Sequence, residues 1–585
     1  MRTFAQPDIE MERRDDGSVV LRSRTSLTDF ESSITAVLRQ RAAEHPDRPF
    51  AAQRDDHDHW VTLTYGDAAR KADTLAAAFR DLGLGAERPV MILSGNSLEH
   101  LLVSLGAYAA GAPAMPISVA YSLMSSDHAR IRAIAELTEP GLVFADDAGP
   151  FAGALDALGL DQVLIARGDR EDAARLDDLL TADSTLDGDP GPGAETVAKL
   201  LFTSGSTGVP KGVINTHRML CSDQAMLQAV WPFLAEEAPV LVDWLPWSHT
   251  FGGNHNLNLA LFNGGTIYID DGKPAPPLFP RTVAALKSVP PTVYFNVPAG
   301  YALLAPALEN DPELAERFFS RLRFMFYAAA ALPDALAERL RALATRRADH
   351  DVPLTSAWGT TETAPGATTM HYLGAPTGCI GVPNPGVAVK LAPVGDKLEI
   401  RVKGPNVTPG YYRAPELTAE TFDEEGYYRS GDAGKLVDES DPNQGVMFDG
   451  RIAENFKLLT GTWVSVGSLR TRLLSTAGVL NDAVICGQDA EYVAALAWVN
   501  PAEARDRSAA ELREHLSRAL GRVNADGGSA ARIERLLLLD APPSLDAGEI
   551  TDKGYLNQRR CLECRADEVG RLYANPPDPE VIRPA

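Results

Sequence analysis

Cysteine is scarce in this chain of 585 residues. The five cysteines are scattered along the chain, which excludes a disulfide framework and favours a reducing compartment. Two of them, Cys561 and Cys564, form a C-x-x-C pair, but no second pair of this kind completes a zinc site. We therefore expect these two thiols to lie on a C-terminal helix without a metal.

Long hydrophobic runs are absent as well. The longest apolar stretch, residues 101–124, is interrupted by two glycines and two prolines, whereas a membrane span needs about 20 predominantly apolar residues in a row. Residues 1–24 are rich in Asp, Glu and Arg and have no apolar core, unlike a secretory signal peptide. The sequence predicts a buried helix followed by a buried strand at 101–124, and a cytoplasmic protein without a membrane span.

Positive charge is in the minority. The 55 Lys and Arg residues against 79 Asp and Glu give a formal net charge of −24, which argues against a broad nucleic-acid-binding surface. An anionic ligand must then be bound by local cations. The hydrophobic share of 45% and the charged share of 23% are typical of a globular protein. The length indicates two or more domains, and we expect a monomer or a homodimer.

Short apolar segments alternate with amphipathic helical segments through most of the chain. Residues 65–82 have helical spacing, whereas 89–94, 240–245 and 322–327 are short apolar segments typical of buried strands. This alternation predicts an α/β fold of layered sheets. Residues 398–403 alternate apolar and charged side chains, which indicates a half-exposed strand in a more antiparallel region.

A separate segment begins near residue 450. The polar residues 438–445 precede it, and the residues beyond have their own strand and helix pattern, enough for a small α+β domain. We predict an N-terminal domain of residues 1–450 and a C-terminal domain of residues 451–585. The proline-rich end, residues 576–585, is expected to be a loosely held tail.

A loop of small and hydroxylated residues follows the apolar run 197–202. Its members are Thr203, Ser204, Gly205, Ser206, Thr207 and Gly208, and Lys211 closes it. Glycines let the backbone approach a ligand, hydroxyls and N–H groups suit phosphate oxygens, and the lysine adds a point charge. The spacing is not that of the loop in which Gly-Lys is followed directly by Ser or Thr. It resembles the phosphate loop of the adenylate-forming superfamily, which includes acyl-CoA synthetases, peptide-synthetase adenylation domains and luciferases.

Further motifs follow in the order known from that superfamily. The resemblance implies an adenine site formed by Trp358, Gly359, Thr360 and Thr361. It implies that Glu362 holds Mg²⁺ against the ATP phosphates, since a hard cation prefers oxygen ligands, and that Asp432 accepts hydrogen bonds from the ribose hydroxyls. Arg451 would lie near the ribose and phosphate. Lys553 would be the catalytic lysine of a mobile C-terminal domain that swings about Glu454, which stands where most relatives have aspartate.

Residues 242–255 are more distinctive than the motifs shared by the whole superfamily. They resemble the corresponding segment of bacterial feruloyl-CoA synthases, also called hydroxycinnamate–CoA ligases. The resemblance runs from about residue 38 to residue 577 and implies an acid-binding pocket lined by His249, Tyr294, Phe295, Asn296, Ala328, Ala329 and Ala330. A packed structural histidine is the alternative for His249, and core packing is the alternative for Tyr294 and Phe295. Ala329 lies in an alanine run where these synthases have glycine, so its methyl group is expected to narrow the pocket.

Together the motifs imply an enzyme that uses ATP and Mg²⁺ to convert an aromatic acid, such as ferulic or coumaric acid, into its acyl-adenylate. The acyl group would pass to coenzyme A, with release of AMP and pyrophosphate. The catalytic residues would be Thr207, Lys211, His249 and Lys553.

Other assignments use the same motifs. The acceptor could be a carrier protein or an amine, or the substrate could be nitrite for diazotisation of an aryl amine. A non-catalytic nucleotide-binding scaffold would not need the complete set of charged residues. A serine hydrolase is disfavoured, because Gly205-Ser206-Thr207-Gly208 is not a Gly-x-Ser-x-Gly elbow.

Overall fold

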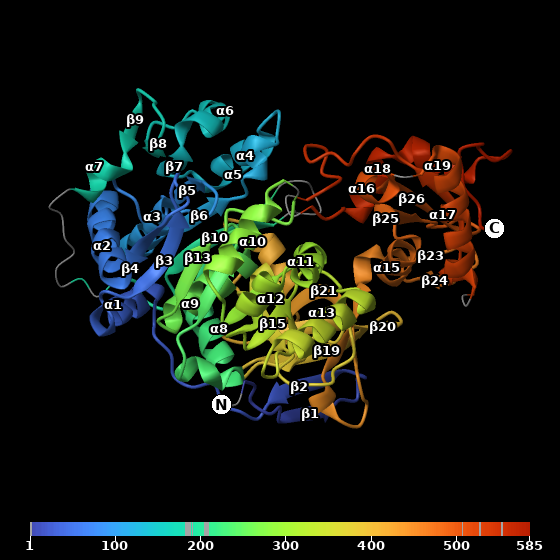
Figure 1. Cartoon of the computed structure of the whole chain (residues 1–585), viewed down its shortest axis with the longest axis horizontal. Helices are drawn as coiled ribbons and strands as arrows, with labels where there is room; N and C mark the ends of the chain where they lie inside the picture. Colours follow the sequence, from blue (N-terminus) through green and yellow to red (C-terminus); the bar gives the residue numbers. More distant parts are fainter. Residues whose placement is uncertain are drawn as a thin grey trace.

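Helices and sheets alternate along the chain and form a large N-terminal part and a smaller C-terminal part (Figure 1). The computed structural model describes residues 3–181, 189, 191–203, 210–275, 277–505, 507–525, 528–551 and 554–585. The phosphate-loop residues Ser204, Gly205, Ser206, Thr207 and Gly208 and the predicted catalytic Lys553 lie outside the described residues.

The first sheet has a parallel centre and an antiparallel edge. Its strand order is β11-β10-β6-β5-β7-β8-β9, and all neighbours are parallel except β10 and β11. The strands are β5 (Val90–Leu93), β6 (Ala114–Ile117), β7 (Leu142–Asp147), β8 (Val163–Arg167), β9 (Ala173–Arg175), β10 (Val197–Thr203) and β11 (Lys211–Thr216). The fully apolar and buried strands β5 and β6 are typical of a parallel sheet covered on both faces.

Two further sheets meet at their edge strands. One has the order β12-β13-β3-β4 and the other β14-β15-β16-β17-β18. The amide of Val240 on β12 donates to Thr292 Oγ1 (2.8 Å), directly before β14. The strands are β3 (Pro49–Arg54), β4 (Trp60–Thr64), β12 (Val240–Asp243), β13 (Thr266–Ile269), β14 (Val293–Asn296), β15 (Phe324–Tyr327), β16 (Leu354–Gly359), β17 (Gly366–Thr369) and β18 (Val382–Pro383).

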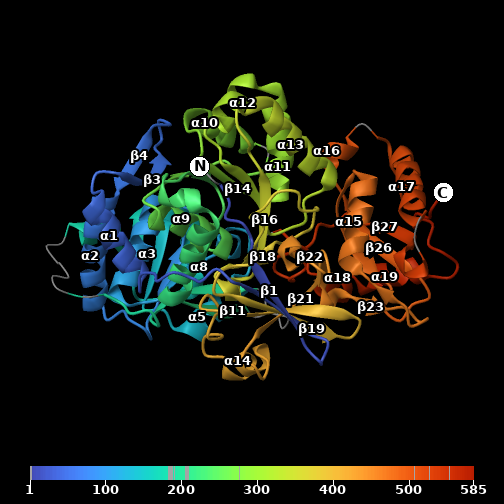
Figure 2. The ribbon, with the colours of Figure 1, turned by 90° about the horizontal axis from the view of Figure 1, so that it is seen from below.

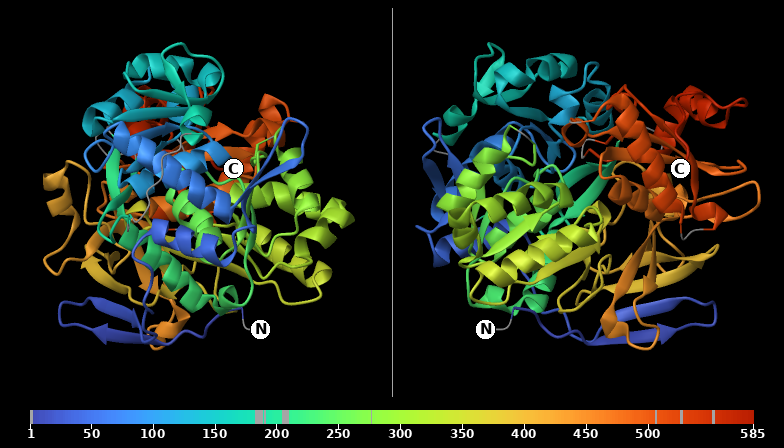
Figure 3. Two further views of the ribbon diagram at one scale, coloured as in Figure 1. Left: turned by 90° about the vertical axis from the view of Figure 1, so that its left-hand side faces the viewer. Right: turned by 45° about the vertical axis from the view of Figure 1, so that its right-hand side comes forward.

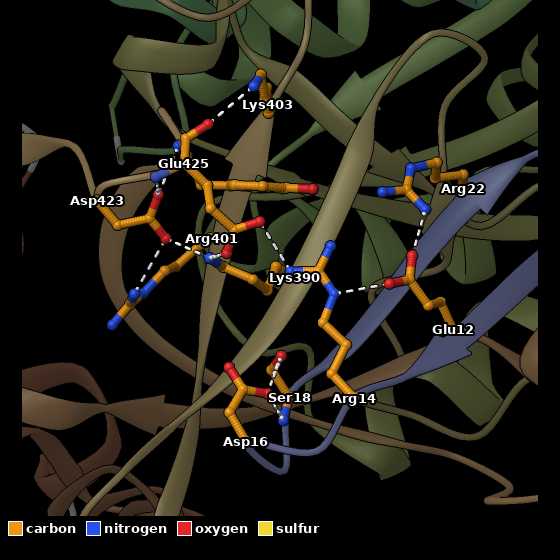
Figure 4. A network of polar contacts seen from close by, with 11 residues as sticks. Glu12, Arg14, Asp16, Ser18, Arg22, Lys390, Arg401, Lys403, Asp423 and Glu425 are labelled. Atoms are coloured by element: carbon orange, nitrogen blue, oxygen red, sulfur yellow. Dashed lines mark hydrogen bonds and ion pairs between the residues drawn. The ribbon is translucent and has the colours of Figure 1, made fainter.

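An antiparallel sheet completes the N-terminal part, as predicted for residues 398–403. Its order is β1-β2-β19-β20-β21-β22, and the dark-blue β1–β2 hairpin runs along the yellow strands (Figure 3). Its strands are β1 (Ile9–Arg13), β2 (Val19–Ser23), β19 (Ala388–Val394), β20 (Lys397–Lys403), β21 (Tyr428–Leu436) and β22 (Val446–Arg451). Beside this sheet, the buried Lys390 of β19 pairs with Asp423 and Glu425 in a network of charged side chains (Figure 4).

The helices of the N-terminal part cover these sheets. Serine and threonine side chains accept hydrogen bonds at their N-termini, as at Thr64 before α2 and Ser97 before α3. The helices are α1 (Ile34–Glu44), α2 (Tyr65–Asp81), α3 (Leu98–Ala110), α4 (Ala120–Leu123), α5 (Ala129–Thr138), α6 (Ala148–Leu158), α7 (Leu176–Leu180), α8 (His217–Val230), α9 (Leu257–Phe262), α10 (Phe279–Ser288), α11 (Pro298–Asn310), α12 (Pro312–Phe319), α13 (Asp334–Arg347) and α14 (Pro415–Thr421). The helix and strand expected at 101–124 are α3 and β6, so that prediction is confirmed.

The C-terminal part has a hydrophobic core of its own, drawn from residues 456–582, and its orange and red elements lie together on one side of the molecule (Figure 2). Its sheet has the order β25-β26-β27, and β23 pairs with β24. The elements are β23 (Phe456–Lys457), β24 (Trp463–Val464), α15 (Val466–Ala477), β25 (Leu480–Cys486), β26 (Val493–Val499), α16 (Pro501–Ala504), α17 (Ala509–Asn524), β27 (Ile533–Leu538), α18 (Gln558–Cys564) and α19 (Ala566–Tyr573). The large α/β domain and the small C-terminal domain are thus as expected, whereas the boundary between residues 450 and 451 stays a prediction.

Two expectations for the C-terminal end differ in outcome. Cys561 and Cys564 do lie on a helix, α18, as free thiols, the first buried and the second exposed. The expectation of a loosely held tail is wrong. Ile582 is buried and pairs with Leu536 of β27 through backbone hydrogen bonds, because its apolar side chain completes the small domain's core.

Candidate active site

The phosphate-loop region begins and ends on two paired strands. Thr203 at the end of β10 is the partner of Lys211 at the start of β11, so the hairpin brings the two ends of the loop together. The ammonium of Lys211 lies 5.4 Å from the ring centroid of Tyr411, within the range of a cation–π contact. The lysine is therefore held beside the antiparallel region that follows the third sheet.

Tyr411 also connects Lys211 with the predicted metal ligand. Its hydroxyl donates to Glu362 Oε1 at 2.8 Å, and the carbonyl of Glu362 accepts from the amide of Thr408 (2.8 Å). Glu362 lies on the short 3-10 helix η3 (Thr361–Thr363) with only 8% of its surface exposed. Sequence reasoning missed Tyr411, because no spacing signal joins residues so far apart along the chain.

Trp358, Asp432 and Arg451 form a second group. The indole N–H of Trp358 donates to Asp432 Oδ2 (3.0 Å), and Arg451 Nε lies 3.5 Å from Asp432 Oδ1. Asp432 and Arg451 are register partners on β21 and β22. Burial raises the pKa of Asp432, and the nearby Arg451 opposes that shift. The structure thus brings together three residues that the motifs had only ordered along the chain.

The backbone that carries Thr360 and Thr361 turns sharply after β16. A side chain at Gly359 would place its Cβ 1.7 Å from the carbonyl oxygen of Pro365, so only glycine fits there. The amide of Thr360 donates to Thr363 Oγ1 (2.8 Å), which closes the turn. This turn presents Glu362 near Tyr411.

His249 precedes a π-helical turn, η2 (Phe251–Asn256). The amide of His249 donates to the carbonyl of Pro246 (3.0 Å), and its own carbonyl accepts from Gly253 (2.8 Å). Side chains at Gly252 and Gly253 would clash with the preceding backbone, because a Cβ there would lie 2.3 and 2.2 Å from carbonyl oxygens. The glycines therefore permit the close turn on which half-buried His249 stands.

Tyr294 and Phe295 lie on opposite faces of β14, as successive strand residues do. Tyr294 packs in the core against Tyr301 and Phe318. Phe295 faces the other way, into a group of aromatic rings formed by Phe251, His255 and Phe326. The two rings therefore cannot line the same side of one pocket. That either ring contacts the acid stays a prediction.

Asn296 is held by its neighbours in a buried position. Its Nδ2 donates to the hydroxyl of Tyr294 (3.1 Å), and its Oδ1 accepts from the indole of Trp244 (3.2 Å). It ends β14, just as Tyr327 ends β15 and Gly359 ends β16. Because these strands are parallel, Asn296, the alanine run after Tyr327 and the predicted adenine residues after Gly359 lie at the same, carboxyl end of the strands.

The alanine run after β15 contains a strained residue. Ala328 is half-buried, whereas Ala329 and Ala330 are exposed. Ala329 has φ of +74°, a left-handed conformation that costs an L-residue roughly 1–2 kcal/mol. Whether its methyl group narrows the acid pocket stays a prediction.

We expect Ala329→Gly to leave the apparent unfolding midpoint unchanged or to raise it. Glycine removes the left-handed strain, which offsets the roughly 0.5–1 kcal/mol that its greater freedom in the unfolded chain costs. The neighbouring Ala330→Gly is the matched control, and it should lower the midpoint. Thermal unfolding of both variants measures the difference between their midpoints. An equal decrease of the midpoint in both would contradict the backbone strain inferred at Ala329.

The segment that leads to Lys553 contacts both domains. Glu549 is buried and forms two hydrogen bonds with Arg565, at 2.6 and 2.9 Å. Four residues earlier, the carbonyl of Leu545 accepts from Arg130 (2.7 Å), and the carboxylate of Asp546 accepts from the hydroxyl of Ser126 (2.9 Å). The segment is therefore anchored in the small domain and touches the large one.

Within the described ranges, no group of three or more His, Cys, Asp or Glu residues could hold a metal ion. A site that uses Glu362 would need oxygen ligands from a bound nucleotide, which is how Mg²⁺ is often held. The described helices also include none that is long and apolar enough to cross a membrane.

Comparison with known proteins gives matches over most of the chain. Residues 38–412 match the AMP-binding enzyme family, and residues 455–576 match the AMP-binding enzyme C-terminal domain. The chain is 28% identical over 546 residues to sulfoacetate–CoA ligase of Cupriavidus necator, covering 89% of this chain and all of that protein. It is 28% identical over 389 residues to feruloyl-CoA synthase of an Amycolatopsis species, covering 64% of this chain and 72% of that protein. The crystal structure of ATP-bound MatB from Rhodopseudomonas palustris has a similar fold, with a TM-score of 0.70 at 23% identity over 92% of this chain and 99% of that one.

Proposed function

We propose that this protein, which belongs to the AMP-binding enzyme family, activates an aromatic acid of the hydroxycinnamic type and transfers it to CoA. The proposal starts from its enzyme type, an AMP-forming adenylating enzyme of the acid–CoA ligase type. The observation that carries the proposal is the shared edge of the third sheet. There Phe295 and Phe326 of the aromatic group lie near the ends of the paired strands β14 and β15, and the turn that carries Glu362 follows the next strand, β16.

The first half-reaction joins the acid to the nucleotide. A carboxylate oxygen of the acid attacks the α-phosphorus of ATP, and the bond from that phosphorus to the bridging oxygen breaks, so that pyrophosphate leaves. Positioning and charge stabilisation carry such a step. Lys211 supplies positive charge near the phosphates, and the carboxylate of Asp432 accepts hydrogen bonds from the ribose hydroxyls.

Glu362 would hold Mg²⁺ in this reaction. Tyr411 donates to Oε1 only, and a carboxylate carries a second oxygen that can bind a cation. When bound there, Mg²⁺ would neutralise charge that develops on the leaving pyrophosphate. Tyr411 holds the carboxylate of Glu362, and the amide of Thr408 holds its main-chain carbonyl.

The second half-reaction transfers the acyl group. The sulfur of CoA attacks the acyl carbon, AMP leaves with the electrons of the acyl–oxygen bond, and the thiol proton is lost to solvent. We propose that the small domain moves about Glu454 between the two half-reactions and withdraws Lys553. The segment from Leu545 to Glu549 would leave Ser126 and Arg130 in that movement.

The aromatic acid is supported by the rings near His249. Phe251, Phe295 and Phe326 lie around His255, with their ring centroids 5.0 to 5.7 Å from that of the imidazole. Burial lowers the pKa of His255 to about 4, so its imidazole is neutral and adds no charge among them. An apolar, aromatic environment of this kind suits a planar ring better than a flexible aliphatic chain.

A panel of acids with ATP, with and without CoA, tests this function. Ferulate, coumarate and caffeate should give pyrophosphate and thioester with a higher kcat/KM than medium-chain fatty acids. AMP, not ADP, should be the nucleotide product. A fatty acid that exceeds every aromatic acid would contradict the substrate class. Pyrophosphate release without thioester would instead favour another acceptor.

A further inference from the structure

Lys199 lies deep inside the large domain, on β10, and neither the motifs nor the proposed reaction uses it. Only 3% of its surface is exposed. Its ammonium donates to the carbonyl of Gly253 (2.8 Å) and to Asn254 Oδ1 (3.1 Å), both in the π-helical turn η2. Both partners are uncharged, so the lysine is buried without the compensation that a carboxylate would give.

These contacts continue into a buried polar network. Asn254 Nδ2 donates to Asn215 Oδ1 (2.8 Å) and to Thr250 Oγ1 (3.1 Å). Asn215, fully buried on β11, is the register partner of Lys199. The network therefore joins the strand pair that flanks the phosphate loop to the turn that follows His249.

The π-helical turn explains why a donor is needed at this place. A π-helical turn is rare and has weaker internal support than an α-helix, and such turns often occur at functional sites. The amide of Gly253 donates to the carbonyl of His249 (2.8 Å), while the carbonyl of Gly253 accepts from Lys199. Lys199 is thus connected to the backbone of His249 through a single residue.

We propose that Lys199 is a positioning residue that holds the turn η2 against the phosphate-loop strands, and so keeps His249 in place for the acid. The inference rests on the proposed function only in giving His249 a place at the acid site. The contact between Lys199 and η2 stands apart from it. An apolar side chain of similar length would fill the same space but would leave the Gly253 carbonyl without this donor.

The chemistry of a buried amine agrees with this role. Burial lowers the pKa of Lys199 to about 7, because a low-dielectric environment disfavours the charged form. A neutral amine still has two N–H donors, which match the two acceptors in η2. The ring of Tyr108 lies on a further side, with its centroid 5.9 Å from the Lys199 nitrogen.

The test compares Lys199→Met with a matched control, Lys390→Met. Lys390 is equally buried, but it lies on β19 and pairs with carboxylates (Figure 4), so its loss should destabilise the chain without affecting η2. Amide hydrogen exchange should be at least about 10-fold faster for residues 249–256 in Lys199→Met, and unchanged there in Lys390→Met. Unchanged protection in Lys199→Met would overturn the proposal.

Kinetics provide a second measurement. In Lys199→Met we expect kcat/KM for the acid to fall roughly 10²-fold, as small misplacements at reacting groups do, while KM for ATP changes less than about twofold. Equal effects on acid and ATP would indicate general damage and overturn the positioning role.

A milder variant covers the case in which Lys199→Met does not fold. Asn254→Ser removes one acceptor and should give the same local increase in exchange to a smaller degree; no increase would count against the proposal. If the wild type activated no acid at all, the proposed function would fail, but the exchange measurements would still decide the role of Lys199.

Discussion

Replacing Lys553 with alanine should slow formation of the acyl-adenylate by roughly 10²–10³-fold, the usual cost of losing one well-placed charge at a transition state. The variant should still convert a supplied acyl-adenylate and CoA into the thioester, because in the proposed mechanism the lysine acts only while pyrophosphate leaves. Pyrophosphate release and single-turnover thioester formation measure the two steps separately. Lys553→Arg keeps the charge and should lose less.

The hinge variant Glu454→Pro should behave in the opposite way. Glu454 ends the 3-10 helix η5 (Ile452–Glu454), and proline there would restrict the backbone of this residue and the one before it. We expect adenylate formation to continue and thioester formation to be lost. If both variants lost both steps equally while remaining folded, the two-position mechanism would not apply to this enzyme.

Replacing Glu362 with glutamine should also reduce adenylation by roughly 10²-fold or more, because the charge proposed to hold Mg²⁺ is lost. Glutamine keeps the shape and can still accept the hydrogen bond of Tyr411 through its Oε1. The rate should be measured over a range of Mg²⁺ concentrations, and calorimetry should show weaker binding of Mg²⁺-ATP. The surface variant Glu439→Gln is the control and should change neither quantity.

Tyr411→Phe tests the hydrogen bond that supports Glu362, the predicted metal ligand. It removes the hydrogen bond to Glu362 Oε1 and leaves the ring beneath Lys211. A hydrogen bond to a charged group contributes about 1.5–3 kcal/mol, so a loss of roughly 10- to 100-fold is expected. A wild-type rate in Tyr411→Phe would show that this hydrogen bond has no part in catalysis.

The elements that could be predicted from the sequence are those with local causes. The helix at 65–82 and the strand at 240–245 were recognisable from apolar spacing, and the structure has α2 (Tyr65–Asp81) and β12 (Val240–Asp243) there. The buried helix and strand at 101–124 followed from the position of the glycines and prolines. In each case the side chains themselves determine the element.

The parts that could not be predicted depend on contacts between distant segments. Nothing local places Tyr411 against Glu362, or Lys199 against Asn254. The docking of residues 576–585 likewise depends on the side chain of Ile582 reaching the core of the small domain. The opposite orientation of Tyr294 and Phe295, by contrast, follows from the alternation of side chains along a strand and could have been foreseen.

Asp432 accepts from Trp358 on one oxygen and faces Arg451 on the other. A nucleotide that uses this carboxylate for its ribose, as proposed, competes with both. Arg451 is the last residue of β22 and directly precedes the 3-10 helix η5, which ends at the proposed hinge residue Glu454. Nucleotide affinity and the position of the hinge are then thermodynamically linked, and the linkage is reciprocal. An interaction that stabilises one position of the small domain must therefore change the free energy of AMP binding by the same amount that AMP binding changes the equilibrium between the two positions.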